Sequence, residues 1–407
     1  MEIENSSVKS FLEGLHNRVP DSLKPQIEQF QTYFNQRLWH QLTGAVEEFL
    51  RQPEAKPFCI ELYNEFIREW SGKMNQINNI LFAIEASEQL KAQDPEQAFK
   101  FMQSVQEPLE KVDKEFRETD DSRPLTHEKQ NAYILSQLQS AGIKLLLLDL
   151  DYTRNTLREC EKRMEALDHV NPVIYSHFYR LSSDYYKAQA KYTEFFNNAL
   201  LFLACIDINR LSFEEKSQFA YDLCLAALLS PTIYNFGRLV DHEIITDPQT
   251  GRNNSWVNEH LYKIVYEFNQ GDVSMYDVLE VSFNQQPLLA QNKDLLRQKM
   301  RQMALMALLY EHPSMKSCHQ IPYESIQQRL RCSKNDAEHL VMKSLALGLI
   351  RGTIDEVAQV VNIHWVQPRH LGREGVEGLI KKLQDWQDTL DGMATNLRES
   401  APELFVK

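Results

Sequence analysis

Glycine is scarce in this chain, with 13 residues among 407. That share is about half of the ~7% that is usual in soluble proteins. Folds that alternate strands and helices need glycine in turns and phosphate-binding loops, where φ is positive or a ligand comes close to the backbone. The shortage argues against an α/β fold, and the abundance of Leu, Ala, Glu, Gln and Lys predicts a mostly α chain.

Long apolar runs and paired cysteines are also lacking. The longest apolar run, residues 199–206, is far shorter than the ~18 residues that cross a bilayer, and the polar, acidic start does not resemble a signal peptide. No Cys-x-x-Cys pair occurs, so we expect reduced thiols and neither disulfide nor metal site. We therefore expect a protein of the cytoplasm and nucleus. The cysteines are Cys59, Cys160, Cys205, Cys224, Cys318 and Cys332.

The charge balance is strongly acidic, with a formal net charge of −13. Such a surface repels nucleic acid and anionic membranes unless a local basic patch exists. We therefore expect neither nucleic acid nor a membrane among the partners.

One short motif suggests an enzyme. In residues 143–157 an apolar run leads into Asp149-x-Asp151-x-Thr153, which resembles the first motif of haloacid-dehalogenase-type phosphatases, with an aspartate nucleophile and an acid/base aspartate. However, the apolar residues recur at three- and four-residue steps, which predicts a helix. On a helix, Asp149 and Asp151 point about 200° apart, and no Gly-Asp-x-x-x-Asp motif follows. We therefore interpret the motif as part of a helix.

Helical periodicity dominates the first three quarters of the chain. Helices over residues 131–150 and 151–167 are expected as a hairpin or as one bent helix, and residues 118–128 are expected as a loop. Helix pairs begin near Asn131, Asn171, Ser212 and Ser255. A spacing of about forty residues is typical of a helical-repeat solenoid.

The pattern changes after Pro313. A helix over residues 298–310 is followed by a short helix with Pro322 in its first turn, and by a helix that Ser333 caps and Gly348 ends. Two alternating segments, residues 349–354 and 360–366, then predict a β-hairpin with a turn at residues 355–358. Three helices and a hairpin make a winged helix.

The alternation assigns the hairpin side chains to two faces. The side chains of one face are expected to pack on the helices and form the core. Those of the other face are expected to point outward or toward a partner. The partner is expected to contact the hairpin at its edge, because an unpaired strand edge offers N–H and C=O groups. The core set is Ile350, Ile354, Val361, Ile363 and Trp365. The partner set is Arg351, Thr353, Asn362 and His364.

Winged helices often bind DNA, so the charges of this one matter. Residues 320–369 carry six basic residues, at 329, 331, 334, 343, 351 and 369, against five acidic ones, at 324, 336, 338, 355 and 356. A DNA reader normally has a basic face. A packing role is therefore favoured over a nucleic-acid-binding winged helix, which remains the alternative from another functional class.

Helical repeats that run into a winged helix resemble the PCI-domain family. Two stretches carry the resemblance more specifically: SPTIYNFGRLVDHEI at 230–244 and GLIRGTIDEVAQVVNIHWVQPR at 348–369. They are similar to segments of a non-ATPase lid subunit of the proteasome regulatory particle. The polar residues 247–255 depart from that likeness, and we expect a loop there.

The resemblance implies a non-catalytic scaffold for ubiquitin-dependent protein degradation. Its expected partners are other PCI and lid subunits, with neighbouring winged helices side by side in a hetero-oligomer. The same architecture also serves the signalosome and translation initiation factor three, which stay open as alternatives. No HExxH or GxxxxGK motif is present, so we expect no enzyme activity, cofactor or metal.

The C-terminal stretch predicts a helix with one apolar seam. Apolar residues alternate three- and four-residue steps over residues 373–398, as in a coiled coil. The seam is Val376, Leu379, Leu383, Trp386, Leu390, Met393 and Leu397. We expect it to join a helical bundle with other lid subunits; folding back on the chain's own body is the alternative. The resulting organisation is N-terminal repeats at 1–170, a PCI domain at 171–370 (helical part 171–312, winged helix 313–370) and a bundle helix at 371–407.

Overall fold

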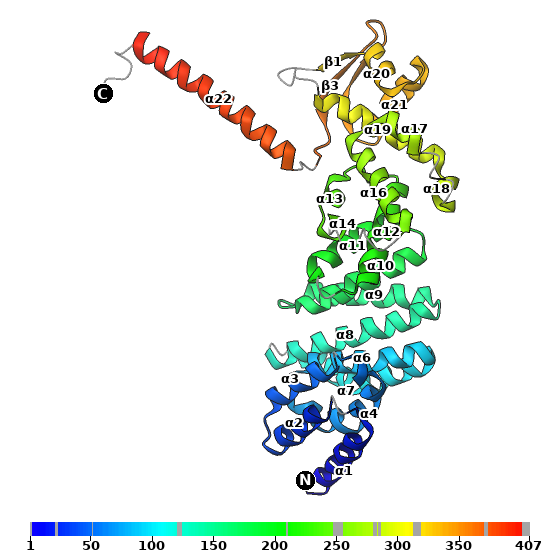
Figure 1. Cartoon of the computed structure of the whole chain (residues 1–407), viewed down its shortest axis with the longest axis vertical. Helices are drawn as coiled ribbons and strands as arrows, with labels where there is room; N and C mark the ends of the chain where they lie inside the picture. The colour runs from blue at the N-terminus through cyan, green and yellow to red at the C-terminus, as the bar shows by residue number, and fades with distance from the viewer. Residues whose placement is uncertain are drawn as a thin grey trace. The chain divides into compact units, whose positions relative to one another are not determined.

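The computed structural model describes residues 2–20, 23–50, 52–119, 124–208, 211–246, 255–279, 283, 286–311, 319–369 and 373–400. The chain divides into two compact units, residues 1–207 and 208–407. The boundary expected at 170/171 lies inside the first unit. Helices followed by one small sheet confirm the mostly α, PCI-type architecture (Figure 1).

The first unit is built from helices only, among its described residues. Its long helices are α1 (Glu2–Arg18), α2 (Lys24–Asn35), α3 (Trp39–Leu50), α6 (Gln76–Gln93), α7 (Pro95–Thr119), α8 (Pro124–Leu146), α9 (Leu150–Ala166), α10 (Pro172–Ala188) and α11 (Tyr192–Cys205). Short pieces fill the gap after α3: η1 (Pro53–Phe58), α4 (Cys59–Leu62), η2 (Tyr63–Ile67), α5 (Arg68–Trp70) and η3 (Ser71–Lys73). Consecutive long helices such as α6 and α7, or α8 and α9, pack against each other (Figure 1).

The second unit combines helices with one small sheet. Its helices are α12 (Phe213–Leu229), α13 (Gly237–Val240), α14 (Glu243–Thr246), α16 (Ser255–Gln270), α17 (Val273–Leu279), α18 (Pro287–Gln291), α19 (Lys293–Glu311), α20 (Tyr323–Leu330), α21 (Lys334–Ala346) and α22 (Arg373–Ser400). Its strands are β1 (His319–Pro322), β2 (Ile350–Asp355) and β3 (Val360–Val366). Of the loop expected at 247–255, residues 247–254 lie outside the described residues, and Ser255 is not in a loop because it begins α16.

The expected helix starts are mostly confirmed. Asn171 caps α10, and Ser212 caps α12 in a reciprocal capping box with Glu215. The start at Asn131 is wrong, because α8 already begins at Pro124, whose fixed φ suits a first turn. Asn131 instead donates a tertiary hydrogen bond from Nδ2 to the carbonyl oxygen of His169, at 3.3 Å.

The expected loop at 118–128 is mostly helical. The helix α7 extends to Thr119 and α8 begins at Pro124. Only residues 120–123 separate the two helices, and these lie outside the described residues. Of the acidic residues in this stretch, Glu118 lies in α7 and Glu128 in α8.

The phosphatase-like motif starts a helix. The turn between α8 and α9 places Leu148 at φ 62°, which confirms the hairpin rather than one bent helix. Asp149 caps α9, because its Oδ1 accepts the N–H of Tyr152 at 3.1 Å. The Thr153 hydroxyl donates to the carbonyl oxygen of Asp149 at 2.9 Å. The side chains of Asp149 and Thr153 thus bond to backbone groups at the start of α9. Asp149 is the N-cap of this helix and does not lie within it.

Two apolar clusters hold the first unit together. Around α2 to α5, the ring of Phe30 meets that of Phe49 edge to face at 5.5 Å and stacks on that of Phe66 at 6.1 Å, and all three are fully buried. Another cluster joins α6, α8, α9 and α10 through side chains such as Leu138 and Ile174. Because each helix layer buries its apolar face against the next, the layers stabilise one another as repeats do.

Candidate functional site

The winged helix contains a three-stranded antiparallel sheet in the order β1-β3-β2. The strand β1 was not expected, since the sequence interpretation placed Pro322 inside a helical turn. In the structure Pro322 ends β1 and precedes α20, in extended conformation at φ −69° and ψ 144°. The next residue, Tyr323, donates its N–H to the carbonyl oxygen of Gln359 at 3.2 Å. The pairing of β1 with β3, from His319 opposite Ile363 to Pro322 opposite Val360, gives the sheet its third strand.

The added strand changes which edge is open. Asn362 lies opposite Gln320 of β1 on one side and Thr353 of β2 on the other. The strand β3 is therefore central, and the expectation that it forms an exposed edge is wrong. Among the described residues, the outer strands are β1 and β2. Of the expected partner set, only Arg351 and Thr353 sit on an outer strand.

A bulge in β3 changes the face of Trp365. Arg351 pairs with Trp365, whereas the next residue, Gly352, pairs with Ile363, so His364 is the extra residue. One inserted residue turns the following side chain to the opposite face. Trp365 therefore joins the face of Arg351, whose Cζ lies 4.6 Å from the centroid of the indole ring. Its assignment to the core is wrong, and Val366 packs against the core instead.

The rest of the hairpin core is as expected. Ile350, Val361 and Ile363 are buried, and Ile354 packs against them. These side chains meet α19, α20 and α21 through residues such as Leu340. The sheet is thus held on its helices by one alternating set of apolar side chains.

The expected partner set lies on the other face or on the bulge. Arg351, Thr353 and His364 are exposed, and Asn362 is half-buried. The side-chain oxygen of Asn362 is buried without a hydrogen-bond partner among the described residues. With Trp365 added, this face combines polar side chains with one large aromatic surface. Such a mixture is typical of protein-binding surfaces.

Three basic residues of the winged-helix region make contacts within the chain. Lys334 at the start of α21 lies 3.7 Å from Glu356 in the hairpin turn. Lys343 donates to Oε1 of Gln298 at 2.6 Å. Arg369 donates to the backbone oxygen of Asn269 on α16. The first contact joins the hairpin turn to α21, the second joins α21 to α19, and the third joins the segment after β3 to α16.

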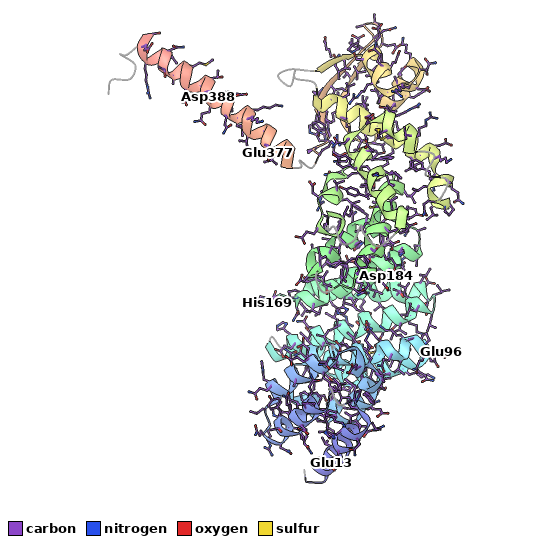
Figure 2. The ribbon with its side chains drawn as sticks, viewed as in Figure 1. Glu13, Glu96, His169, Asp184, Glu377 and Asp388 are labelled. Carbon is purple, nitrogen blue, oxygen red and sulfur yellow. The ribbon has the colours of Figure 1, made fainter. Side chains whose placement is uncertain are left out.

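The C-terminal helix α22 carries the expected seam. All seven seam side chains are exposed, from 44% at Val376 to 63% at Trp386. Ile380 adds a further apolar side chain that is 48% exposed. Figure 2 shows the side chains of α22, with the acidic Glu377 and Asp388 labelled. An apolar stripe this long is unusual on a free surface.

The described residues offer little reactive chemistry. Burial raises the pKa of Cys160 and Cys224 to about 12 and that of Cys59 to about 11, so these thiols stay protonated at neutral pH. Within the described ranges, no cluster of three His, Cys, Asp or Glu side chains could hold a metal ion. In the same ranges no helix is long and apolar enough to cross a membrane.

Comparison with known proteins identifies two matched segments. The model for PSD13 N-terminal repeats matches residues 26–261, and the model for the PCI domain matches residues 272–365. The second segment covers the winged helix and the helices that precede it.

Full-length relatives agree with these matches. The chain is 31% identical over 407 residues to the probable 26S proteasome regulatory subunit rpn9 of Schizosaccharomyces pombe, covering 100% of both chains. It is 32% identical to 26S proteasome non-ATPase regulatory subunit 13 homolog B of Arabidopsis thaliana, over 97% of this chain and 98% of that one. It is 27% identical to 26S proteasome regulatory subunit RPN9 of Saccharomyces cerevisiae, over 99% of both. The chain therefore belongs to the PCI-domain family of 26S proteasome regulatory subunits that includes rpn9 and non-ATPase regulatory subunit 13.

Proposed function

We propose that this protein is a non-catalytic structural subunit of the lid of the proteasome regulatory particle, and that it supports ubiquitin-dependent protein degradation. Its partners are other PCI and lid subunits in a hetero-oligomer, and it works in the cytoplasm and nucleus. Two relatives of this family carry names that call them regulatory subunits of the 26S proteasome, and a third is named a non-ATPase regulatory subunit. The absence of a recognisable catalytic motif in the sequence agrees with a scaffold.

The observation that carries the proposal is the exposed seam of α22. Burying an apolar side chain of this size contributes about 1.5–3 kcal/mol, and seven of them stand half-exposed along one stripe. An isolated helix gains little from propensity alone and is stabilised mainly by packing. Partner helices that cover the stripe therefore offer a large driving force for assembly.

The winged-helix sheet supplies a second contact in this proposal. The outer strand β2 presents Arg351 and Thr353, and the neighbouring Trp365 lies against Arg351. An outer strand can add the strand of a partner, or pack its face on one. Of the edge contact expected on both hairpin strands, the part on β2 is kept and the part on β3 is withdrawn.

The test is incorporation of a tagged chain into proteasomes in cells. Leu383→Asp with Trp386→Asp places two carboxylates on the seam, and the matched control, Gln384→Asp with Gln387→Asp, places two at the same spacing beside it. We expect proteasome ATPases and lid subunits to co-purify with the wild type and the control but not with the seam variant. Circular dichroism of each purified chain checks that the body still folds. Normal incorporation of the seam variant would refute the bundle role, and recovery of translation factors alone would refute the proteasome assignment.

A further inference from the structure

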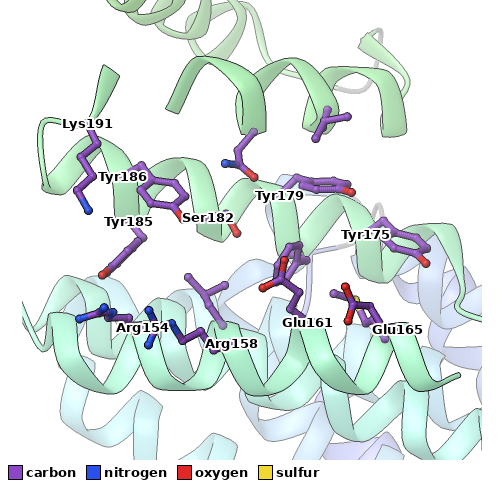
Figure 3. Close-up of a pocket in the computed structure, with 15 residues that line it drawn as sticks. Arg154, Arg158, Glu161, Glu165, Tyr175, Tyr179, Ser182, Tyr185, Tyr186 and Lys191 are labelled. Carbon is purple, nitrogen blue, oxygen red and sulfur yellow. The ribbon is translucent and has the colours of Figure 1, made fainter. Parts of the chain in front are cut away.

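A groove lined by α9, α10 and α11 lies in the first unit. Its volume is about 540 Å³, its walls come from α9 and from the α10–α11 region, and α10 forms its floor (Figure 3). The floor positions follow helical three- and four-residue steps: Tyr175, Tyr179, Ser182 and Tyr186. The three tyrosines are half-buried. A stripe of tyrosines provides rigid, amphipathic contact area that loses little entropy on binding.

The wall formed by α9 is polarised in charge. Arg154 and Arg158 line one end, and Glu161 and Glu165 line the other. Figure 3 shows the arginines at the end where Lys191 lies, and the glutamates beneath Tyr179 and Tyr175. Eleven residues of helix span about 16 Å. One end of the groove thus attracts a negative group, and the other end attracts a positive one.

The two arginines carry no ion pair among the described residues, although the charge of Arg158 acts on Tyr186. On the same helix, Arg163 is paired with Glu159 at 2.7 Å and lies over the ring of Tyr133. Neither Arg154 nor Arg158 has a carboxylate within ion-pair distance in the described part of the chain. Two guanidinium groups one turn apart form a site that fits a carboxylate, because each can donate two parallel hydrogen bonds.

We propose that this groove binds a short acidic segment of a partner protein, with a carboxylate on Arg154 and Arg158 and apolar or aromatic side chains on the tyrosine floor. A basic or neutral residue of the same segment then faces Glu161 and Glu165. At about 3.3 Å per residue, an extended peptide of five residues spans the groove. The inference concerns a surface of the helical repeats and does not depend on the assembly role of α22.

The charge pattern favours a peptide over a nucleic acid. A polyanionic strand laid along the groove would place phosphates against Glu161 and Glu165, and the whole chain already carries a net charge of −13. A peptide can carry opposite charges a few residues apart. The groove volume is also in the range of about 300–1,000 Å³ that is usual for sites that enclose a small ligand or a few side chains.

The experiment uses the full chain and a fluorescein-labelled peptide of sequence acetyl-Glu-Glu-Leu-Phe-Ala-Lys-amide, followed by fluorescence anisotropy. We expect saturable binding that weakens at least about tenfold in Arg154→Glu with Arg158→Glu, because two charge-assisted contacts are lost. Replacing the two glutamates of the peptide by glutamine should weaken binding similarly. A peptide with lysines at those places should bind the double variant better than the wild type.

The controls separate a built site from general charge. The control variant Lys162→Glu with Lys187→Glu changes the net charge by as much as Arg154→Glu with Arg158→Glu does, but at two exposed positions outside the groove. This variant should bind the acidic peptide as the wild type does. Melting temperatures check that all variants are folded. An absence of saturable binding, equal weakening in both double variants, or tighter binding of a ten-residue oligouridine than of the peptide would each overturn the proposal. None of these outcomes affects the test of α22, because that test measures incorporation into proteasomes and not peptide binding.

Discussion

The ammonium group of Lys299 lies 2.6 Å from the carbonyl oxygen of Ala227 and caps the C-terminal end of α12 from within α19. It also donates to the carbonyl oxygens of Leu228 and Ser230, at 3.3 Å and 2.6 Å. The ring centroids of Tyr234 and Phe236 lie 5.4 Å and 5.0 Å from Nζ of Lys299. The free carbonyl groups at a helix C-terminus favour a cation, whereas burial opposes the charge and lowers the pKa of Lys299. This one buried side chain therefore joins the helical part of the second unit to the first helix of the winged helix.

Replacing Lys299 by methionine should destabilise the protein. The substitution keeps the apolar stem but leaves three buried carbonyl oxygens without their donor. The expected loss is about 2–4 kcal/mol in the free energy of unfolding, measured by urea denaturation. Arg297→Met, at an exposed position on the same helix, should change it by no more than about 0.5 kcal/mol. Equal stability of the two variants would show that the capping contact contributes nothing.

The stability should also depend on pH through Lys299. Burial lowers the pKa of this side chain from 10.5 to about 7, while the unfolded chain keeps the ordinary value. Between those two pH values the unfolded state binds more protons, so the free energy of unfolding rises with pH. In the folded protein the Tyr234 hydroxyl stays protonated in that window, because burial raises its pKa to about 12, and its titration in the unfolded chain cancels in a comparison with Lys299→Met. Measured at pH values across the window, the wild type should gain stability relative to Lys299→Met; a constant difference would contradict the lowered pKa.

An acid-sensitive position lies in the first unit, at His177 on α10. Burial, with the nearby charges of Arg180 and Lys91, lowers the pKa of His177 to about 4. Between about 6.5 and 4 the unfolded state binds more protons, so stability falls as the pH falls through that range, by up to about 3 kcal/mol. His177→Gln removes the titrating group. We expect the melting temperature of the wild type to fall more steeply than that of the variant from pH 7 to pH 4; parallel curves would contradict this assignment.

The sequence predicts those parts of the structure that depend on local pattern. The cap at Ser212 and the seam from Val376 to Leu397 follow from residues a few positions apart, and both are found. The strand β1 is four residues long and ends in proline, so its pairing with β3 depends on residues about forty positions away. The bulge at His364 likewise changes the face of Trp365 without any signal in the alternating pattern.

The peptide groove is harder to foresee for the same reason. Its tyrosines occupy ordinary helical positions on α10 and its arginines ordinary exposed positions on α9. Only the packing of α9 against α10 brings the charged residues of α9 close to the tyrosines of α10. The matching three- and four-residue spacing of charges and tyrosines on adjacent helices is the one signal in the sequence that could have indicated it.

The close pairing of β2 with β3 makes Gly352 sensitive to any side chain. A Cβ atom at this residue would lie 2.3 Å from the carbonyl oxygen of Asn362, which is backbone and cannot rotate away. Gly352→Ala must therefore separate the strands next to the bulge, and we expect a loss of about 2–3 kcal/mol in the free energy of unfolding.

The matched control for that substitution is Gly392→Ala on α22. A Cβ at Gly392 meets no atom within 4 Å, and alanine favours a helix over glycine by up to about 1 kcal/mol. Far-UV circular dichroism should show equal or greater helicity in this variant, whereas Gly352→Ala should lower the urea midpoint. If Gly352→Ala unfolds at the wild-type midpoint, the strands are not as close at the bulge as the register requires. The outer strand β2 would then lack the rigid geometry that a partner contact through Arg351 and Thr353 needs.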